Sequence, residues 1–175
     1  MSPRKADPAV RSVLIATAAR LLAQDGSNAL TLRRVTSDAG TSTMAVYTHF
    51  GGMDELKREV RRTGYAALAE ALTAAGTEIE PLCRAYAAFA REQPDLYRVM
   101  FMEAPLDEQD AAECAGTFAM LAEGAQRHLG PEGDGEALAM ELWAAGHGVV
   151  TLELSALLTP EQAESLAASL RAKLL

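Results

Sequence analysis

The sequence predicts an all-α fold in which a small domain with a helix-turn-helix precedes a larger helical domain. Three observations support this prediction: alanine and leucine dominate, no stretch alternates apolar and polar residues as a strand would, and proline or glycine recurs at helix-length intervals. Apolar residues make up 49% and charged residues 23% of the 175 residues, a balance typical of folded globular proteins. We expect an N-terminal three-helix domain over residues 1–60, with a fourth helix bridging to about residue 75, and a second domain over residues 76–175.

The first three helices are bounded by residues that cap or stop helices. At each start an Asp, Thr or Ser side chain can accept a hydrogen bond from an unpaired backbone N–H, and at each end a glycine permits the terminating turn. In chain order, the expected caps and stops are Asp7 with Gly26, Thr31 with Gly40, and Ser42 with Gly51. The second and third helices are therefore short, over residues 32–39 and about 43–49.

Six further helices are indicated by proline and capping signals. They are expected near residues 53–75, 81–93, 94–102, 107–129, 136–158 and 160–174. Pro81, Pro94 and Pro160 each suit the first position of a helix, where the missing N–H costs nothing. Thr159 and Gln162 also form a capping-box pattern, the strongest local start signal in the chain.

The charges divide unevenly along the chain, whose formal net charge is −8. Residues 1–64 carry ten basic and six acidic side chains, whereas residues 65–175 carry six basic and eighteen acidic ones. The first third can therefore meet a polyanion, but the acidic remainder would repel it, so any such contact must be oriented.

Residues 31–50 match a helix-turn-helix, in which the second helix enters the DNA major groove. Val35 on the first short helix and Val46 and Phe50 on the second are spaced to dock the pair against the preceding helix. The second helix then presents small polar groups, a methionine and an aromatic hydroxyl outward, with no acid among them. Such a face suits contact with DNA.

The same stretch resembles the DNA-binding domain of the tetracycline-repressor-like (TetR) family of bacterial regulators. The resemblance covers roughly residues 9–60, through "AARLLAQDG" and "TLRRVTSDAGTSTMAVYTHFGGMDEL". The residues that fall on the family's "AGVSxxTLYxHF" pattern are Gly40, Ser42, Tyr47, His49 and Phe50, and Asp54-Glu55-Leu56 continues it.

The resemblance implies a role for each matched residue. Phosphate contacts are implied for Thr31, Tyr47 and His49, and a phosphate or groove-edge contact for Arg33. Contacts to base edges are implied for Ser42, Thr43, Met44 and Thr48, with Met44 able to touch a thymine methyl. The chain departs from the family at Met53 and Thr43, where lysine is common. At Met53 one phosphate contact is expected either to be lost or to move to Lys57.

Residues 80–170 resemble a regulatory domain named for its Trp-His-Gly signature, here Trp143, His147 and Gly148. The resemblance implies effector sensing and dimerisation. Small residues on the penultimate helix would let a second copy approach closely, as in a four-helix bundle. The expected dimer interface comprises Ala144, Gly148, Leu152, Ser155, Leu166 and Leu170, with packing inside one chain as the alternative.

Large aromatic groups concentrate in the second domain and could line an effector pocket for a small, mainly apolar molecule. The candidate residues are Tyr86, Phe89, Tyr97, Phe101, Phe118, Trp143 and His147. Such groups at helical spacing more often form an ordinary core than a ligand pocket, and a histidine such as His147 is more often a satisfied interior residue.

Several classes of protein have no support in the sequence. The histidines lack metal-ligand spacing, and HExxH, CxxC, glycine-rich phosphate-loop and GxSxG motifs are missing, so we expect no metal, no cofactor and no enzyme. Cys83 and Cys114 are too few for a disulfide framework, and either buried thiols or a redox switch remains open. No apolar run reaches the roughly 20 residues of a membrane span and no secretory signal is present, so a cytoplasmic protein is expected.

Together these patterns predict a homodimeric DNA-binding regulator, a repressor that a small-molecule effector releases from a palindromic double-stranded operator. Two recognition helices about 34 Å apart would read the two half-sites. The alternative is a helical ligand-sequestering or partner-binding protein with little DNA binding, for which only Met53 and Thr43 speak.

Overall fold

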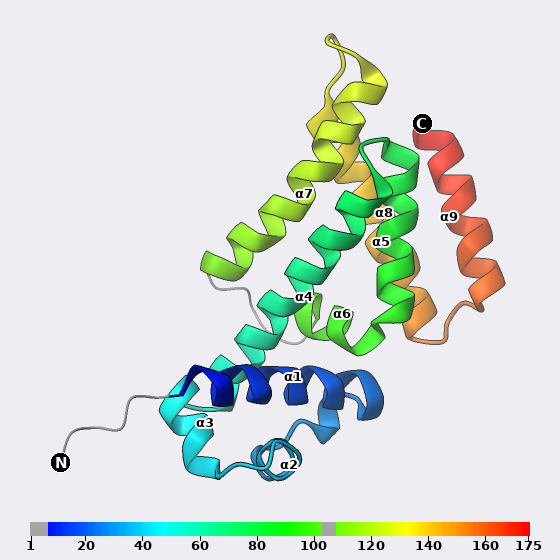
Figure 1. Ribbon diagram of the computed structural model, residues 1–175. Coiled ribbons are helices and arrows are strands. Elements are labelled where there is room, and N and C mark those ends of the chain that lie inside the picture. The colour runs from blue at the N-terminus through cyan, green and yellow to red at the C-terminus, as the bar shows by residue number, and fades with distance from the viewer. Residues whose placement is uncertain (1–6, 103–107) are drawn as a thin grey trace. The chain divides into compact units, whose positions relative to one another are not determined.

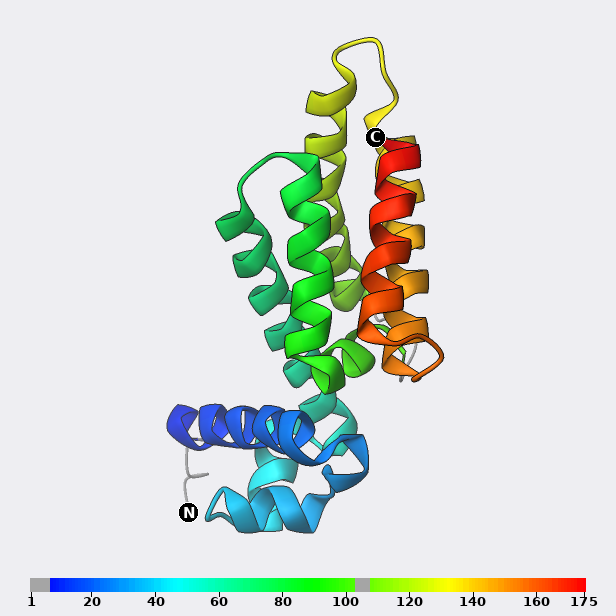
Figure 2. The ribbon, with the colours of Figure 1, turned by 90° about the vertical axis from the view of Figure 1, so that its right-hand side faces the viewer.

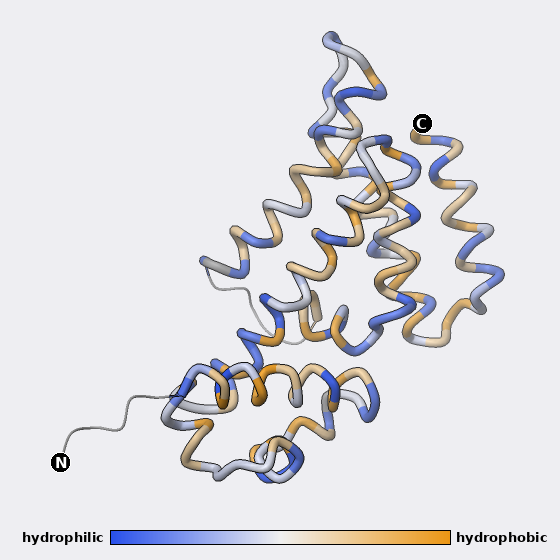
Figure 3. Tube along the Cα trace, in the orientation of Figure 1, coloured by the Kyte–Doolittle hydropathy of each residue, from blue (hydrophilic) through white to orange (hydrophobic). Residues whose placement is uncertain are grey.

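The computed structural model describes residues 7–102 and 108–175, and within these ranges the regular elements are all helical (Figure 1). The α-helices are α1 (Pro8–Asp25), α2 (Leu32–Asp38), α3 (Thr43–Phe50), α4 (Met53–Ala75), α5 (Ile79–Glu92), α6 (Pro94–Phe101), α7 (Glu108–Leu129), α8 (Gly135–Leu154) and α9 (Pro160–Leu174), with a short 3₁₀ turn, η1 (Ser27–Ala29), after α1. The all-α prediction is confirmed. Apolar and polar residues interleave along each helix (Figure 3), and no helix among the described residues could cross a membrane.

The described residues fall into two compact units that do not follow the order of the chain. One unit contains the residues up to Gly64 together with α6, and the other contains Tyr65–Pro94 and the residues from 108 onward. The chain first passes from one unit to the other between Gly64 and Tyr65, inside the predicted interval of residues 60–76, and the assignment of α6 to the first unit was not predicted. The buried Arg61 donates from Nε to the carbonyl oxygen of Val99 at 3.0 Å, and Gly64 leaves room for Met100, whose Sδ would lie 2.6 Å from a Cβ there.

In the first unit, α1 packs against both α2 and α3 (Figure 1). Leu14 and Leu21 of α1 are completely buried, as are Val35 of α2 and Val46 of α3, and Phe50 is only 7% exposed. The docking predicted from the spacing of these apolar residues is confirmed.

The second unit is a bundle in which α8 packs against α5, α7 and α9 (Figure 2). Its buried centre brings together Ile79 of α5, Ala125 of α7 and three residues of α8, which are Leu138, Ala139 and Leu142. Burying these apolar side chains supplies the main driving force for the bundle.

Most predicted helix boundaries are confirmed by their capping contacts. The side chains of Asp7 and Thr31 accept hydrogen bonds from Ala9 N at 2.9 Å and Arg34 N at 3.3 Å. Thr159 and Gln162 complete the capping box of α9. Ser42 stands at the N-cap position of α3, but its side chain makes no capping hydrogen bond.

Two predicted boundaries are wrong. Helix α5 begins at Ile79 rather than at Pro81, because a proline within the first turn removes no helical hydrogen bond. Helix α8 ends at Leu154 rather than at residue 158, because Ala156 adopts a left-handed conformation with φ 56°. Ser155 is thus the C-cap of α8 and not part of the helix.

Replacing Gly135 with alanine is expected to destabilise the protein by about 1–3 kcal/mol, although alanine favours helices. A Cβ at this position would lie 2.6 Å from the backbone N and Cα of Gln126, which cannot move aside as a flexible side chain could. Gly116 of α7 is the matched control, because a Cβ there meets nothing within 4 Å. Gly116→Ala should stabilise by about 0.5–1 kcal/mol in the same guanidinium chloride titration, and equal effects of the two variants would contradict the packing argument.

Candidate functional site

The α2–turn–α3 segment has the geometry of a helix-turn-helix. Helix α2 ends at Asp38, and Gly40 adopts φ 62° in the turn, a conformation that glycine reaches without strain. The amide of Thr41 donates to the carbonyl oxygen of Thr36 at 2.9 Å, which closes the turn. Helix α3 ends at Phe50. Its C-cap is Gly51, whose φ is 74° and whose amide donates to the carbonyl oxygen of Tyr47.

The outer face of α3 carries large side chains that the fold leaves in water. Met44 is 67% exposed and Tyr47 is 52% exposed, although both are large enough to contribute to a core. On the opposite face Val46 and Phe50 are buried. Nothing within the first unit requires a methionine and a tyrosine on that outer face, so their exposure indicates a surface that meets a partner.

The residues predicted to contact DNA lie at accessible positions. Exposed side chains are Thr31, Arg33, Ser42, Thr43, Met44, Tyr47 and Thr48, whereas His49 and Lys57 are half-buried. The hydroxyl of Thr48 donates to the carbonyl oxygen of Met44 at 2.8 Å within the helix, so it is oriented along α3 and retains its lone pairs as acceptors.

Adjacent arginines on α2 differ in whether their charge is compensated. Arg34 pairs with Asp25 at 2.8 Å and lies 3.7 Å from Asp38. Arg33 forms no ion pair with any residue that the structure describes, and the same holds for Lys57 on α4. These two cations are therefore available to an external anion.

Other arginines of the first unit are held by carboxylates of the same unit. Arg20 pairs with Asp38 at 3.2 Å, Arg58 with Glu55 at 2.6 Å, and Arg62 with Glu59 at 2.6 Å. A count of charges along the sequence does not show this compensation. The Arg20–Asp38 pair joins two helices, whereas the other two pairs are three residues apart on α4. The excess of basic residues is thus concentrated, among the described residues, at a few positions around the helix-turn-helix.

In the second unit four predicted pocket residues form one aromatic cluster, which we define as Tyr86, Phe118, Trp143 and His147. The centroid of the Trp143 ring lies 5.9 Å from that of Phe118 and 4.7 Å from that of His147. In both pairs the edge of one ring faces the other. The hydroxyl of Tyr86 lies 2.9 Å from Nδ1 of His147, a hydrogen bond between α5 and α8. Burial lowers the pKa of His147 to about 4, so its ring is neutral at neutral pH.

The other predicted pocket residues are Phe89, Tyr97 and Phe101. Tyr97 and Phe101 lie on α6 in the first unit, where their rings contact each other with centroids 5.0 Å apart. Phe89 lies on α5 and is buried. Tyr97 and Phe101 therefore belong to a different unit from the aromatic cluster, and the lining of one pocket by all seven residues stays a prediction.

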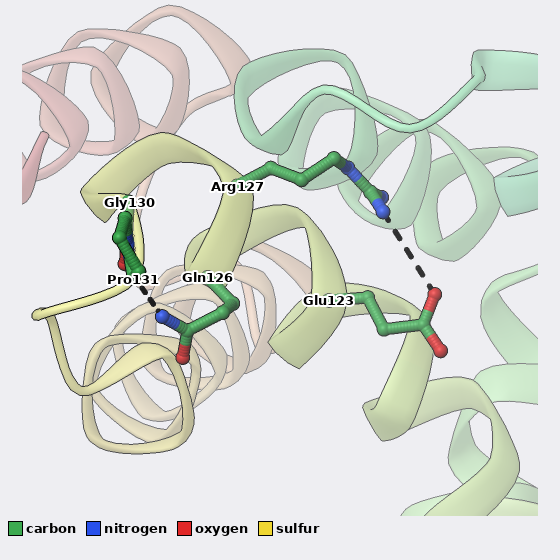
Figure 4. Close-up of a pocket in the computed structure, with 5 residues that line it drawn as sticks. All are labelled: Glu123, Gln126, Arg127, Gly130 and Pro131. Atoms are coloured by element: carbon green, nitrogen blue, oxygen red, sulfur yellow. Dashed lines mark hydrogen bonds and ion pairs between the residues drawn. The ribbon is translucent and has the colours of Figure 1, made fainter.

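A hollow of about 420 Å³, open to solvent, lies instead at the end of α7 (Figure 4). Its lining residues are Glu123, Gln126, Arg127, Gly130 and Pro131. Gln126 donates from Nε2 to the carbonyl oxygen of Gly130 at 2.7 Å, and Arg127 donates to that of Thr77 at 2.8 Å. Gln126 holds the loop after α7 and Arg127 holds the segment between α4 and α5, so these polar groups give no indication of a ligand site.

The predicted dimer residues lie mostly on an exposed apolar stripe. On α8 the stripe comprises Met140, which the sequence analysis missed, Ala144, Gly148 and Leu152. On α9 Leu166 is 37% exposed and Leu170 is half-buried. Ser155 is exposed but lies beyond the end of α8, so it does not continue the stripe.

Neither cysteine has the environment of a redox sensor. Burial raises the pKa of the Cys83 thiol to about 11 and also raises the pKa of Cys114, so the reactive thiolate is scarce at neutral pH. Among the described residues no group of His, Cys, Asp or Glu side chains could hold a metal ion.

Comparison with known proteins gives two family matches. Residues 14–60 match the model described as "Bacterial regulatory proteins, tetR family", and residues 79–174 match "Tetracyclin repressor-like, C-terminal domain". The Trp-His-Gly resemblance is not tested by these matches and stays a prediction. A search of curated proteins finds no match.

Solved structures share the fold over almost the whole chain. One of them is described as a regulatory protein, SCO4313. It is 26% identical to this chain, with a TM-score of 0.79, and the match covers 99% of each chain. The multidrug binding protein EbrR, crystallised with imidazole, is 23% identical with a TM-score of 0.70, over 99% of this chain and 93% of its own. A tetR-family transcriptional regulator from Streptomyces coelicolor is 17% identical, with a TM-score of 0.74, and the match covers 94% of this chain and 78% of that chain.

The protein is expected to lose stability as the pH falls from about 6.5 to about 4. The pKa of His147 is about 4 in the folded protein and about 6.5 when unfolded, so between these values only the unfolded chain takes up the proton. Unfolding free energies measured across this range should fall toward acid, and His147→Phe should remove that part of the slope. An unchanged slope in His147→Phe would show that another group is responsible.

Proposed function

The chain belongs to the TetR family of bacterial regulatory proteins, and we propose on this basis that it is a repressor that a small molecule releases from its operator. Members of this family are DNA-binding transcriptional regulators and not enzymes. The operator, the dimer and the effector below are proposals for this chain. A cytoplasmic location follows from them, because a bacterial regulator must reach the chromosome.

The observation that carries the proposal is the outer face of α3. Met44 and Tyr47 extend into solvent there, and no acidic residue occurs between Asp38 and Asp54. Ser42, Thr43 and Thr48 complete a face of small polar groups that fits a major groove. In this arrangement Met44 touches a thymine methyl and the hydroxyls read base edges.

Phosphate contacts flank this face. The uncompensated cations of Arg33 and Lys57 pair with phosphates on either side of the groove. Thr31, Tyr47 and His49 add hydrogen bonds that fix the register without reading sequence.

A symmetric dimer would present two such faces to a palindromic operator. The stripe on α8 supports this arrangement, because Gly148 has open space where a partner helix could approach closely. Leu166 and Leu170 of α9 extend the apolar surface. Two recognition helices about 34 Å apart would then engage two half-sites.

The aromatic cluster is the proposed effector site, for a small, mainly apolar molecule. Neutral His147 and the Tyr86 hydroxyl supply one polar handle among rings. Proteins of this fold crystallised with imidazole and with choline support a small-molecule ligand. The effector releases DNA only to the extent that it binds the released conformation more tightly than the DNA-bound one.

The test is a fluorescence-anisotropy titration of purified protein against genomic fragments, including its own upstream region, at two salt concentrations. Saturable binding to particular fragments that weakens with salt is the expected result. Weak binding that ignores sequence at both salt concentrations would favour the ligand-sequestering alternative. Compounds that reverse selective binding would identify the effector.

Arg33→Ala is expected to lower operator affinity by about 1.5–3 kcal/mol, since it removes a charged donor to phosphate. It should also reduce the slope of log affinity against log salt by about 0.9, the value for one phosphate contact. Arg34→Ala is the matched control, because it removes the same charge next in sequence from a side chain already paired with Asp25. Equal losses in the two variants would contradict the distinction between compensated and available cations.

Gly148→Leu is expected to convert the dimer to monomer without unfolding the chain. A Cβ at this exposed position would meet nothing within 4 Å in the single chain, so we expect a partner subunit to be what the leucine obstructs. Light scattering after size exclusion measures the mass. Gly116→Leu on α7, where the space is equally open, should remain dimeric; a dimeric Gly148→Leu would place the interface elsewhere.

A further inference from the structure

Arg11 on α1 contacts the end of the recognition helix, although nothing in the sequence singled it out. Its guanidinium carbon lies 5.3 Å from the centroid of the Phe50 ring, the geometry of a cation–π contact. Its Nη2 also lies 2.7 Å from Oε2 of Glu59 on α4. One side chain thus touches α3 and α4 from α1.

In the ion pair between Arg11 and Glu59, the glutamate is the less exposed of the two side chains. Its side chain is 17% exposed, whereas that of Arg11 is 43% exposed. The other oxygen of Glu59 lies 2.6 Å from Nη1 of Arg62, one turn along α4. Arg62 therefore holds the carboxylate of Glu59 on α4, and this carboxylate can hold the more exposed guanidinium of Arg11 over the Phe50 ring.

Helix α3 needs such external support. It has eight residues, too few for an isolated helix to be stable, so its position depends on its contacts with the rest of the unit. Phe50 is its last residue, and the chain turns at Gly51 directly after it. A displacement of the Phe50 ring would move His49 and Tyr47, which lie within the same final turn.

We propose that Arg11 is a positioning residue for DNA recognition: anchored by Glu59, its guanidinium holds Phe50 and thereby sets the orientation of the last turn of α3. This role rests on the proposed function, because that turn carries residues assigned to phosphate contacts. It is distinct from a direct contact between Arg11 and DNA, and from a general contribution to stability.

Three variants separate these roles. Arg11→Met keeps the aliphatic stem and removes the guanidinium, and Glu59→Gln removes the anchor while making the protein less acidic. Arg20→Met is the matched control, because Arg20 lies on the same helix, is 46% exposed and pairs with Asp38 of α2. Each is titrated as the full chain against the fragment that the wild type selects and against a fragment that it does not, over a range of salt concentrations.

Arg11→Met and Glu59→Gln should each weaken binding to the selected fragment by about threefold to tenfold relative to the other fragment. Glu59→Gln is decisive, because removing a negative charge would by itself tighten binding to DNA. The double variant should lose little more than Arg11→Met, since both changes disrupt one arrangement. Tighter selective binding by Glu59→Gln, or a fall of about 0.9 in the salt slope of Arg11→Met alone, would overturn the proposal, the latter in favour of a direct phosphate contact.

Amide hydrogen exchange without DNA provides a readout independent of the operator. Exchange at Gly51, whose amide is bonded to Tyr47 O at 2.9 Å, should be faster in Arg11→Met and Glu59→Gln than in Arg20→Met, while amides in the second unit remain unchanged. If the wild type selects no fragment, the proposed function fails but this comparison still decides the positioning role. Equal exchange at Gly51 in all three variants would overturn it.

Discussion

The burial of one side of α3 against α1 is the constraint on which the DNA-facing surface depends. A helix of eight residues has too few internal hydrogen bonds to persist alone. Val46 and Phe50 fix it to the first unit, and because side chains on opposite faces diverge, the same contacts hold Met44 and Tyr47 in solvent. The buried residues therefore determine how the exposed ones are presented.

The positive charge that the first unit offers to a partner depends more on which arginines are paired than on how many arginines it has. Carboxylates on α1, α2 and α4 compensate most of the arginines close to them, and such exposed pairs contribute little to stability. Their larger effect is on what remains for a partner: Arg33 is available although its neighbour Arg34 is not. An acidic protein can in this way keep a basic edge at its helix-turn-helix while the second unit repels DNA.

In the second unit small residues decide which surfaces can approach one another. Gly135 allows the start of α8 to lie against the backbone of Gln126, whereas Gly148 has open space beside it. The first glycine serves packing within the chain, and the second is free to serve an interface. Between these positions the Tyr86–His147 hydrogen bond joins α5 to α8 and keeps a polar handle among the aromatic rings.

The sequence by itself determined the helical class, most helix ends, the helix-turn-helix and the outward side of α3. These features depend on local signals: capping side chains, positive-φ glycines and apolar residues at helical spacing. It did not determine that α6, with Tyr97 and Phe101, belongs to the first unit, or that Ser155 lies beyond α8. Nor could it reveal that Arg11 reaches Phe50 and Glu59, or which arginines are compensated. The unit of α6 and the contacts of Arg11 depend on residues far apart in the chain, and residue order carries no direct record of such distances. The end of α8 and pairs such as Glu55–Arg58 are local, but the sequence allows several local arrangements and only the structure shows which one forms.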